Sequence, residues 1–139
     1  MNIRLISTVL FLGAAGAAHA QEPPNLVGVW NGPALAVGIG SNPYRVPEVP
    51  GPVFFDKPIE FSYAITAQQG TRFSGTLTSG KGTETVIGAL KPPAYNSGVF
   101  LDDDGRYDFT IRDAKTIDLC YEHQYPKTKV VACYTLTKQ

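Results

Sequence analysis

The sequence predicts an all-β fold, a single antiparallel up-and-down β-barrel of about seven or eight strands. Two observations lead to it. After residue 20, apolar and polar side chains alternate with a period of two, and no stretch sustains a helical period. Two cysteines, Cys120 and Cys133, also lie in alternating segments that can pair as a hairpin. A β-sandwich would show the same alternation and is the alternative. Short sequential turns favour the barrel, whose closure also removes exposed strand edges.

The cysteines fix the register of the predicted last hairpin. When Cys120 is placed opposite Cys133, apolar residues meet on one face of the ribbon and polar residues on the other. Directly opposed residues lie within disulfide reach, so we predict a Cys120–Cys133 disulfide on the polar face. The other predicted pairs are Ile117 with Leu136, Leu119 with Tyr134, Tyr121 with Ala132, Thr116 with Thr137, and Asp118 with Thr135.

Residues 1–20 have the organisation of a signal peptide. Arg4 precedes an apolar stretch over residues 5–15, and Ala18-His19-Ala20 matches an A-x-A cleavage site. The alternative, a membrane anchor, is disfavoured because the apolar stretch is too short to span a bilayer. We therefore expect an exported bacterial protein, periplasmic or secreted, without membrane insertion. Export makes a disulfide the default state of two cysteines.

The remaining residues, 21–139, have the size of one domain. Arg4 is the one charged residue of the first twenty, so 11 basic residues face 12 acidic ones in the rest. No basic stripe is present, and we expect neither nucleic-acid binding nor attraction to an anionic membrane. His123 is the single histidine after residue 20, so we expect no metal site and no cofactor.

The first predicted strand covers residues 26–30, and a long loop rich in proline and glycine follows it at 33–58. Proline lacks a backbone donor, so this segment is not expected to form a central strand. We interpret it as a flexible loop over the barrel, with a solvent-exposed insertion of no particular role as the alternative. Its prolines are Pro33, Pro43, Pro47, Pro50, Pro52 and Pro58.

The strands after this loop follow one another through short turns. Alternation predicts strands over 59–66, 72–78, 83–90, 97–101 and 107–111, before the cysteine hairpin. Gln69-Gly70, Gly80-Lys81-Gly82 and Asp104-Gly105 provide turns, and residues 91–96 form a somewhat longer loop.

Gly28-Val29-Trp30, in the first predicted strand, resembles the G-x-W signature of calycin barrels, the lipocalin and avidin group. The resemblance implies that Trp30 packs across a closed end of the barrel, beneath a basic side chain that Lys138 would supply. The several tryptophans of the avidin pocket are missing here, so biotin binding is not implied. A broader resemblance, over 73–76, 86–89, 103–105, 116–121 and 132–137, is to a group of small exported bacterial proteins without an established activity.

Inward-facing aromatic side chains are the candidate ligand-binding residues. Aromatic walls with a few phenol hydroxyls suit an apolar ligand with a polar end, while the alternative is that the rings simply fill the barrel. The set consists of Trp30, Phe61, Tyr63, Phe73, Tyr107, Phe109, Tyr121 and Tyr134.

Two polar features, the aspartate-rich turn at 102–105 and His123, are interpreted primarily without a catalytic or metal-binding role. Asp102-Asp103-Asp104-Gly105, with Asp108, has a faint likeness to a calcium loop but lacks the full ligand alternation and the terminal glutamate. It is interpreted as a charged hairpin turn, with weak cation binding by the three adjacent carboxylates as the alternative. His123 is interpreted as a solvated loop residue just past the cysteine strand, with an acid–base group near Glu122 as the alternative. No nucleophile elbow or phosphate loop is present, so no catalytic residue is proposed.

These observations favour a binding protein with a small apolar or aromatic ligand in the barrel. The alternative is a protein-binding or inhibitor module with a filled barrel as its scaffold, and a calycin-like barrel enzyme is a third hypothesis. The first two predict different interiors, since a carrier needs an apolar void of about 300 Å³ or more. A monomer is expected because a closed barrel has no free edges.

Overall fold

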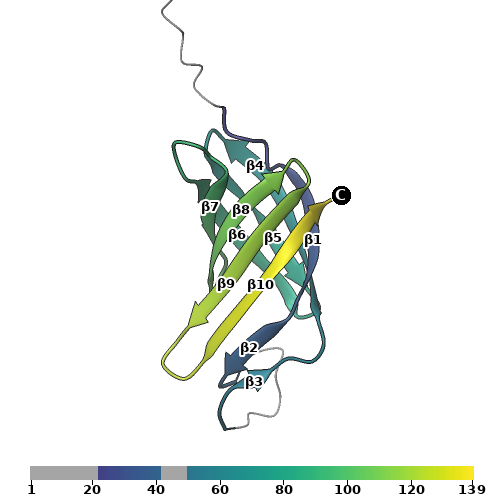
Figure 1. Ribbon diagram of the computed structural model, residues 1–139, viewed down its shortest axis with the longest axis vertical. Coiled ribbons are helices and arrows are strands. Elements are labelled where there is room, and N and C mark those ends of the chain that lie inside the picture. Colours follow the sequence, from purple (N-terminus) through teal and green to yellow (C-terminus); the bar gives the residue numbers. More distant parts are fainter. Residues whose placement is uncertain (1–21, 42–49) are drawn as a thin grey trace, which may run out of the picture.

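The computed structural model describes residues 22–41 and 50–139, and every regular element within them is a β-strand (Figure 1). None of these residues belongs to a helix that is long and apolar enough to cross a membrane. The predicted signal peptide, residues 1–20, lies outside the described residues. The strands are β1 (Gly28–Ala34), β2 (Ala36–Ile39), β3 (Val53–Phe54), β4 (Ile59–Gln69), β5 (Arg72–Ser79), β6 (Gly82–Leu90), β7 (Ser97–Leu101), β8 (Arg106–Asp113), β9 (Thr116–Gln124) and β10 (Lys129–Lys138).

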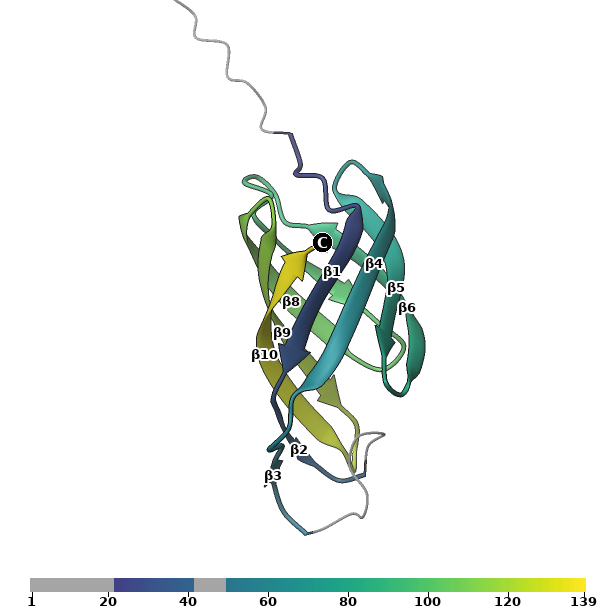
Figure 2. The ribbon, with the colours of Figure 1, turned by 90° about the vertical axis from the view of Figure 1, so that its right-hand side faces the viewer.

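Eight of the strands form a closed antiparallel barrel. The order β1-β4-β5-β6-β7-β8-β9-β10 follows the chain, and β10 returns to pair with β1 (Figure 2). The closing contact places Trp30 opposite Lys138 and Asn31 opposite Thr137. The closure confirms the predicted up-and-down barrel and excludes the two-sheet alternative. Side chains alternate between interior and solvent along each strand, as a barrel requires.

The last hairpin has the predicted register. Cys120 lies opposite Cys133, and the other pairs proposed from the sequence are all present. The two sulfur atoms form a disulfide on the outer face, while Leu119 and Leu136 of the same hairpin are buried in the core.

The predicted loop at 33–58 differs from the structure in part. Pro33 lies inside β1 opposite Glu60, and two further strands, β2 and β3, occur within the stretch. Pro33 is tolerated because β1 pairs with β10 only at Trp30 and Asn31, so at Pro33 the strand has a single neighbour. Strand β2 continues beside the lower part of β10, and β3 pairs with β2 outside the barrel (Figure 1). Residues 42–49, with Pro43 and Pro47, lie outside the described residues.

One end of the barrel is closed around Trp30, as the calycin resemblance implied. The Trp30 side chain is 2% exposed, and its indole N–H donates to the carbonyl of Leu26 at 2.8 Å. The Lys138 ammonium lies 5.1 Å from the ring centroid, within cation–π range. Leu26, in the segment before β1, is also buried and seals this end.

Two glycines make room for close packing inside the barrel. A β-carbon at Gly88 would lie 2.3 Å from the Phe73 ring and 2.6 Å from the Phe100 β-carbon, so a side chain there would displace aromatic neighbours. At Gly75 the obstacle is instead the backbone of β4, because a β-carbon would lie 2.0 Å from the carbonyl oxygen of Ala64. Gly88 therefore accommodates aromatic rings, whereas Gly75 accommodates the neighbouring strand.

Candidate functional site

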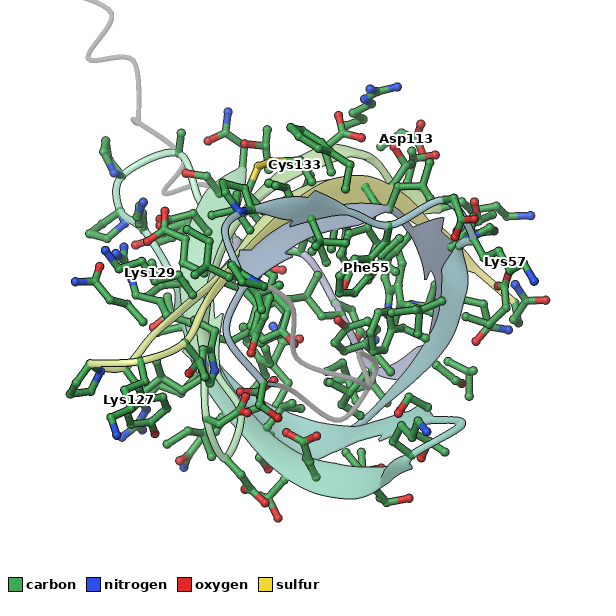
Figure 3. All side chains as sticks on the ribbon, turned by 90° about the horizontal axis from the view of Figure 1, so that it is seen from below. Phe55, Lys57, Asp113, Lys127, Lys129 and Cys133 are labelled. Atoms are coloured by element: carbon green, nitrogen blue, oxygen red, sulfur yellow. A yellow bond between two sulfur atoms is a disulfide. The ribbon has the colours of Figure 1, made fainter. Side chains whose placement is uncertain are left out.

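A cavity of about 140 Å³ opens at the end of the barrel opposite Trp30, beside β2 and the segment after β3. Figure 3 looks into this end and shows Phe55 at the opening, within the ring of strands. The Phe55 backbone N–H donates to the carbonyl of Ala36 at 2.9 Å, which fixes the residue next to β2. The short pairing of β2 with β10 and β3 thus shapes this opening.

One side of the cavity is apolar. Alternate residues of β10 point into it, with Val130 and Ala132 followed by Tyr134, and Phe61 of β4 stacks on the Tyr134 ring at 5.8 Å. The remaining apolar lining comes from β1, β2, β4, β5 and the segment after β3, namely Ala34, Ala36, Ile59, Leu77 and Phe55.

The other side is acidic and begins at the β7–β8 turn. Asp102 Oδ1 accepts backbone hydrogen bonds from Asp104 at 3.2 Å and Gly105 at 2.6 Å, so this carboxylate shapes the turn. Asp102 Oδ2 accepts a hydrogen bond from the Tyr107 hydroxyl at 2.6 Å, and Asp104 Oδ1 accepts one from the Tyr121 hydroxyl at 2.8 Å. The predicted charged turn is therefore also a wall of the cavity.

Glu84 of β6 completes the acidic wall. Single oxygens of Glu84, Asp102 and Asp104 lie within 4.8 Å of one another. Glu84 Oε2 is shielded from solvent and has no hydrogen-bond partner within the described parts of the chain. Burial raises the pKa of Glu84 above its usual 4.5, and repulsion from the aspartates of the turn raises it further, against a smaller opposing effect of the Asp103 backbone. The three carboxylates thus concentrate negative charge in the wall, and keeping all of them ionised costs free energy unless a cation lies nearby.

The tyrosine hydroxyls of the cavity remain neutral. Burial is the largest cause of the raised pKa of Tyr107, Tyr121 and Tyr134. Nearby carboxylates raise these pKa values further, and the Tyr63 and Tyr134 hydroxyls hydrogen-bond to each other. The phenols therefore act as fixed hydrogen-bonding groups rather than as acids or bases.

His123 is not the solvated loop residue expected from the sequence. It lies within β9, and its side chain is only 10% exposed. Its Nε2 shares a hydrogen bond with the Thr128 hydroxyl at 2.8 Å, and its Nδ1 lies 3.4 Å from Asp104 Oδ2. The sequence-based interpretation was wrong because β9 extends three residues past Tyr121, which turns His123 toward the barrel interior.

The eight predicted aromatic residues divide between the two ends of the barrel. Phe61, Tyr107, Tyr121 and Tyr134 line the open cavity. Trp30, Phe73 and Phe109 surround a void of only about 30 Å³ in the closed half, and Tyr63 borders that void while its hydroxyl reaches Tyr134. The interior is therefore mostly filled, and the remaining space suits one aromatic ring more than a large apolar molecule.

Several residues of the site were not identified from the sequence. Phe100 does not line the cavity but borders the void of the closed half and stacks on Tyr107 at 4.1 Å; its alternation with Gly98 in β7 could have revealed it. Asp102 and Asp104 were interpreted as residues of a charged turn, with weak cation binding as the alternative. Glu84 is in phase with the buried Val86 and Leu90 of β6, so alternation could have revealed it. Phe55 carries no local signal, because pairing with β2 brings it to the opening.

Comparisons with known proteins give no relative. No protein-family model, no curated protein and no solved structure matches this chain. The barrel architecture agrees with the calycin resemblance at the level of fold, and functional inference rests on the cavity itself.

Proposed function

We propose that this protein is an exported binding protein whose open barrel end holds a small apolar or aromatic ligand, or one such group of a larger ligand. The observation that carries the proposal is the cavity with an apolar side formed by Phe61, Val130 and Ala132 and a polar side formed by tyrosines and carboxylates. Ligand sites commonly combine mostly apolar lining with a few fixed polar groups.

At about 140 Å³ the cavity is smaller than the void of about 300 Å³ expected for a carrier of a whole apolar molecule. Its size and rigidity therefore support a small ligand, or one group of a larger ligand. A volume of about 140 Å³ resembles that of engineered cavities that bind benzene. The cavity walls are strands of a closed barrel, so little ordering should accompany binding, and pre-organised sites lose less affinity to ordering.

Export is supported by two independent features. The Cys120–Cys133 disulfide fits an oxidising compartment, and residues 1–20 have the composition of a signal peptide. We therefore place the protein in the periplasm or outside the cell.

A blocking substitution tests ligand binding. We expect Val130→Trp to fill the cavity and to abolish binding of 2-phenylethanol, measured by NMR chemical-shift titration. Val131→Trp is the matched control, because Val131 is the next residue of β10 and faces solvent at 47% exposure. A thermal-shift screen with lipids, haem-like compounds and aromatic metabolites would broaden the search. Binding that persists unchanged in folded Val130→Trp protein would refute the assigned site.

A second candidate function, protein binding, is favoured by an apolar row outside the barrel. Val131, Val37 and Phe54 are neighbours in register across β10, β2 and β3, and Phe54 is 78% exposed. With a mostly filled interior, the barrel would then serve as a scaffold that presents this row. Loss of partner capture in Phe54→Glu protein, with 2-phenylethanol binding retained, would support this function, and the absence of any captured partner would argue against it.

A further inference from the structure

We infer that the ligand of the open barrel end carries an organic ammonium group attached to its apolar or aromatic body. This inference rests on the proposed ligand-binding function and specifies the chemical class of the ligand. The cavity defines where a ligand lies, and the charges of its wall define which ligand is favoured.

The balance of charge in the cavity lining is negative. Three carboxylates, Glu84, Asp102 and Asp104, border it, and the basic groups of the lining are Lys81 and His123. His123 lies near Asp104, whereas the Lys81 ammonium, in the exposed β5–β6 turn, forms no ion pair with any residue in 22–41 or 50–139. The wall therefore attracts a cation and repels a carboxylate or phosphate.

The hydrogen bonding of the wall leaves one carboxylate oxygen, Glu84 Oε2, that needs a hydrogen-bond donor. Both oxygens of Asp102 already accept hydrogen bonds, and Asp104 accepts one from Tyr121. Glu84 Oε2 has none within the part of the chain that the structure describes. A buried acceptor without a donor is costly, and an ammonium group offers three N–H donors to satisfy it.

The surroundings favour an organic cation over a bare metal ion. Calcium takes six to eight oxygen ligands, whereas this wall offers three carboxylates that are partly engaged in hydrogen bonds. Opposite the carboxylates lie Phe61, Val130 and Ala132, which suit a hydrocarbon body and not a hydrated ion. The Phe61 and Tyr121 rings add aromatic surface, which also attracts ammonium groups.

Three probes of nearly equal size separate charge from shape: 2-phenylethylamine, 2-phenylethanol and phenylacetate, titrated into the protein at neutral pH by NMR. We expect the amine to bind at least tenfold more tightly than the alcohol, and phenylacetate to bind most weakly. Glu84→Gln should weaken amine binding roughly tenfold to a hundredfold, the effect of losing one charge-assisted hydrogen bond, and should leave alcohol binding within about twofold. Glu60→Gln, at an exposed glutamate of β4 outside the cavity, should change neither.

The outcomes separate this inference from the proposed function. Equal binding of amine and alcohol, or unchanged amine binding in Glu84→Gln protein, would overturn the ammonium assignment and leave the ligand site in place. Saturable calcium binding that displaces the amine would assign the wall to a metal ion instead. If none of the three probes binds, the proposed function itself fails. Tighter amine binding in Lys81→Gln protein would support the inference, because that substitution removes a competing positive charge.

Discussion

The disulfide between β9 and β10 gives a stability prediction whose size follows from the structure. Cys120 and Cys133 are directly opposed and 13 residues apart, and their Cα atoms are separated by 4.0 Å. Both lie on the outer face, so the double substitution Cys120→Ala with Cys133→Ala should leave the aromatic core intact. The main effect should be on the unfolded chain, which loses a cross-link and gains conformational entropy.

The chain-entropy model gives about 3 kcal/mol for a loop of this length. For a domain of roughly 120 residues, each kcal/mol shifts the melting temperature by about 4 °C, so the expected decrease is roughly 10 °C. The barrel is closed independently by β1 and β10, so the double variant should keep the β-sheet circular dichroism spectrum.

Thermal unfolding followed by circular dichroism measures this effect. Dithiothreitol should lower the melting temperature of the unsubstituted protein to that of the double variant, and it should not affect the double variant. Mass spectrometry should find no free thiols in the natively exported protein. A decrease below about 2 °C, with the disulfide shown to be intact before reduction, would refute the reasoning that the cross-link constrains the unfolded chain.

Three further predictions concern the core, the acidic wall and the closed end. Gly88→Ala should lower the free energy of unfolding in urea by about 1–3 kcal/mol, because a β-carbon there overlaps aromatic neighbours. Gly80→Ala is the control and should be nearly neutral, because a β-carbon at Gly80 meets no atom within 4 Å. Equal effects of the two substitutions would contradict the packing argument. The pKa of Glu84 is raised above 4.5 in the folded protein, so the folded protein holds this proton more tightly than the unfolded chain does. Stability is therefore lost as the pH rises through the pKa of the unfolded chain toward the pKa of the folded protein. Glu84→Gln should therefore raise the melting temperature at pH 7 and leave it unchanged well below pH 4.5, and a decrease at pH 7 would show that the charge is compensated. Lys138→Met should lower the free energy of unfolding by about 0.5–1 kcal/mol, because the cation above Trp30 is lost, and should alter the tryptophan fluorescence spectrum. An unchanged spectrum would show that the ammonium does not lie over the ring in solution.

Much of the fold was predictable because the chain carries strong local signals. Alternation along β4 to β10 identified which side chains face inward, and a one-residue slip in any strand would expose the core. The opposed cysteines set the register of β9 and β10, and the short turns indicated that neighbours in the sequence are neighbours in the barrel.

The site was less predictable, since it combines residues that are distant along the chain. Glu84 meets the β7–β8 turn because β6 pairs with β7, with Ile87 opposite Leu101. His123 faces inward because β9 continues past the cysteine. Phe55 follows a two-residue strand that is ordered by pairing with β2, so no local pattern predicts its place at the opening.

The sequence by itself determined the β-barrel class, the pairing of the last hairpin and the inward set of aromatic rings, because side-chain alternation is a local property of each strand. Only the tertiary structure decided that most of these rings fill the interior while a small cavity with an acidic wall remains at one end. That outcome depends on how side-chain volumes from eight strands add up in a closed space, and on which charges strand pairing brings together.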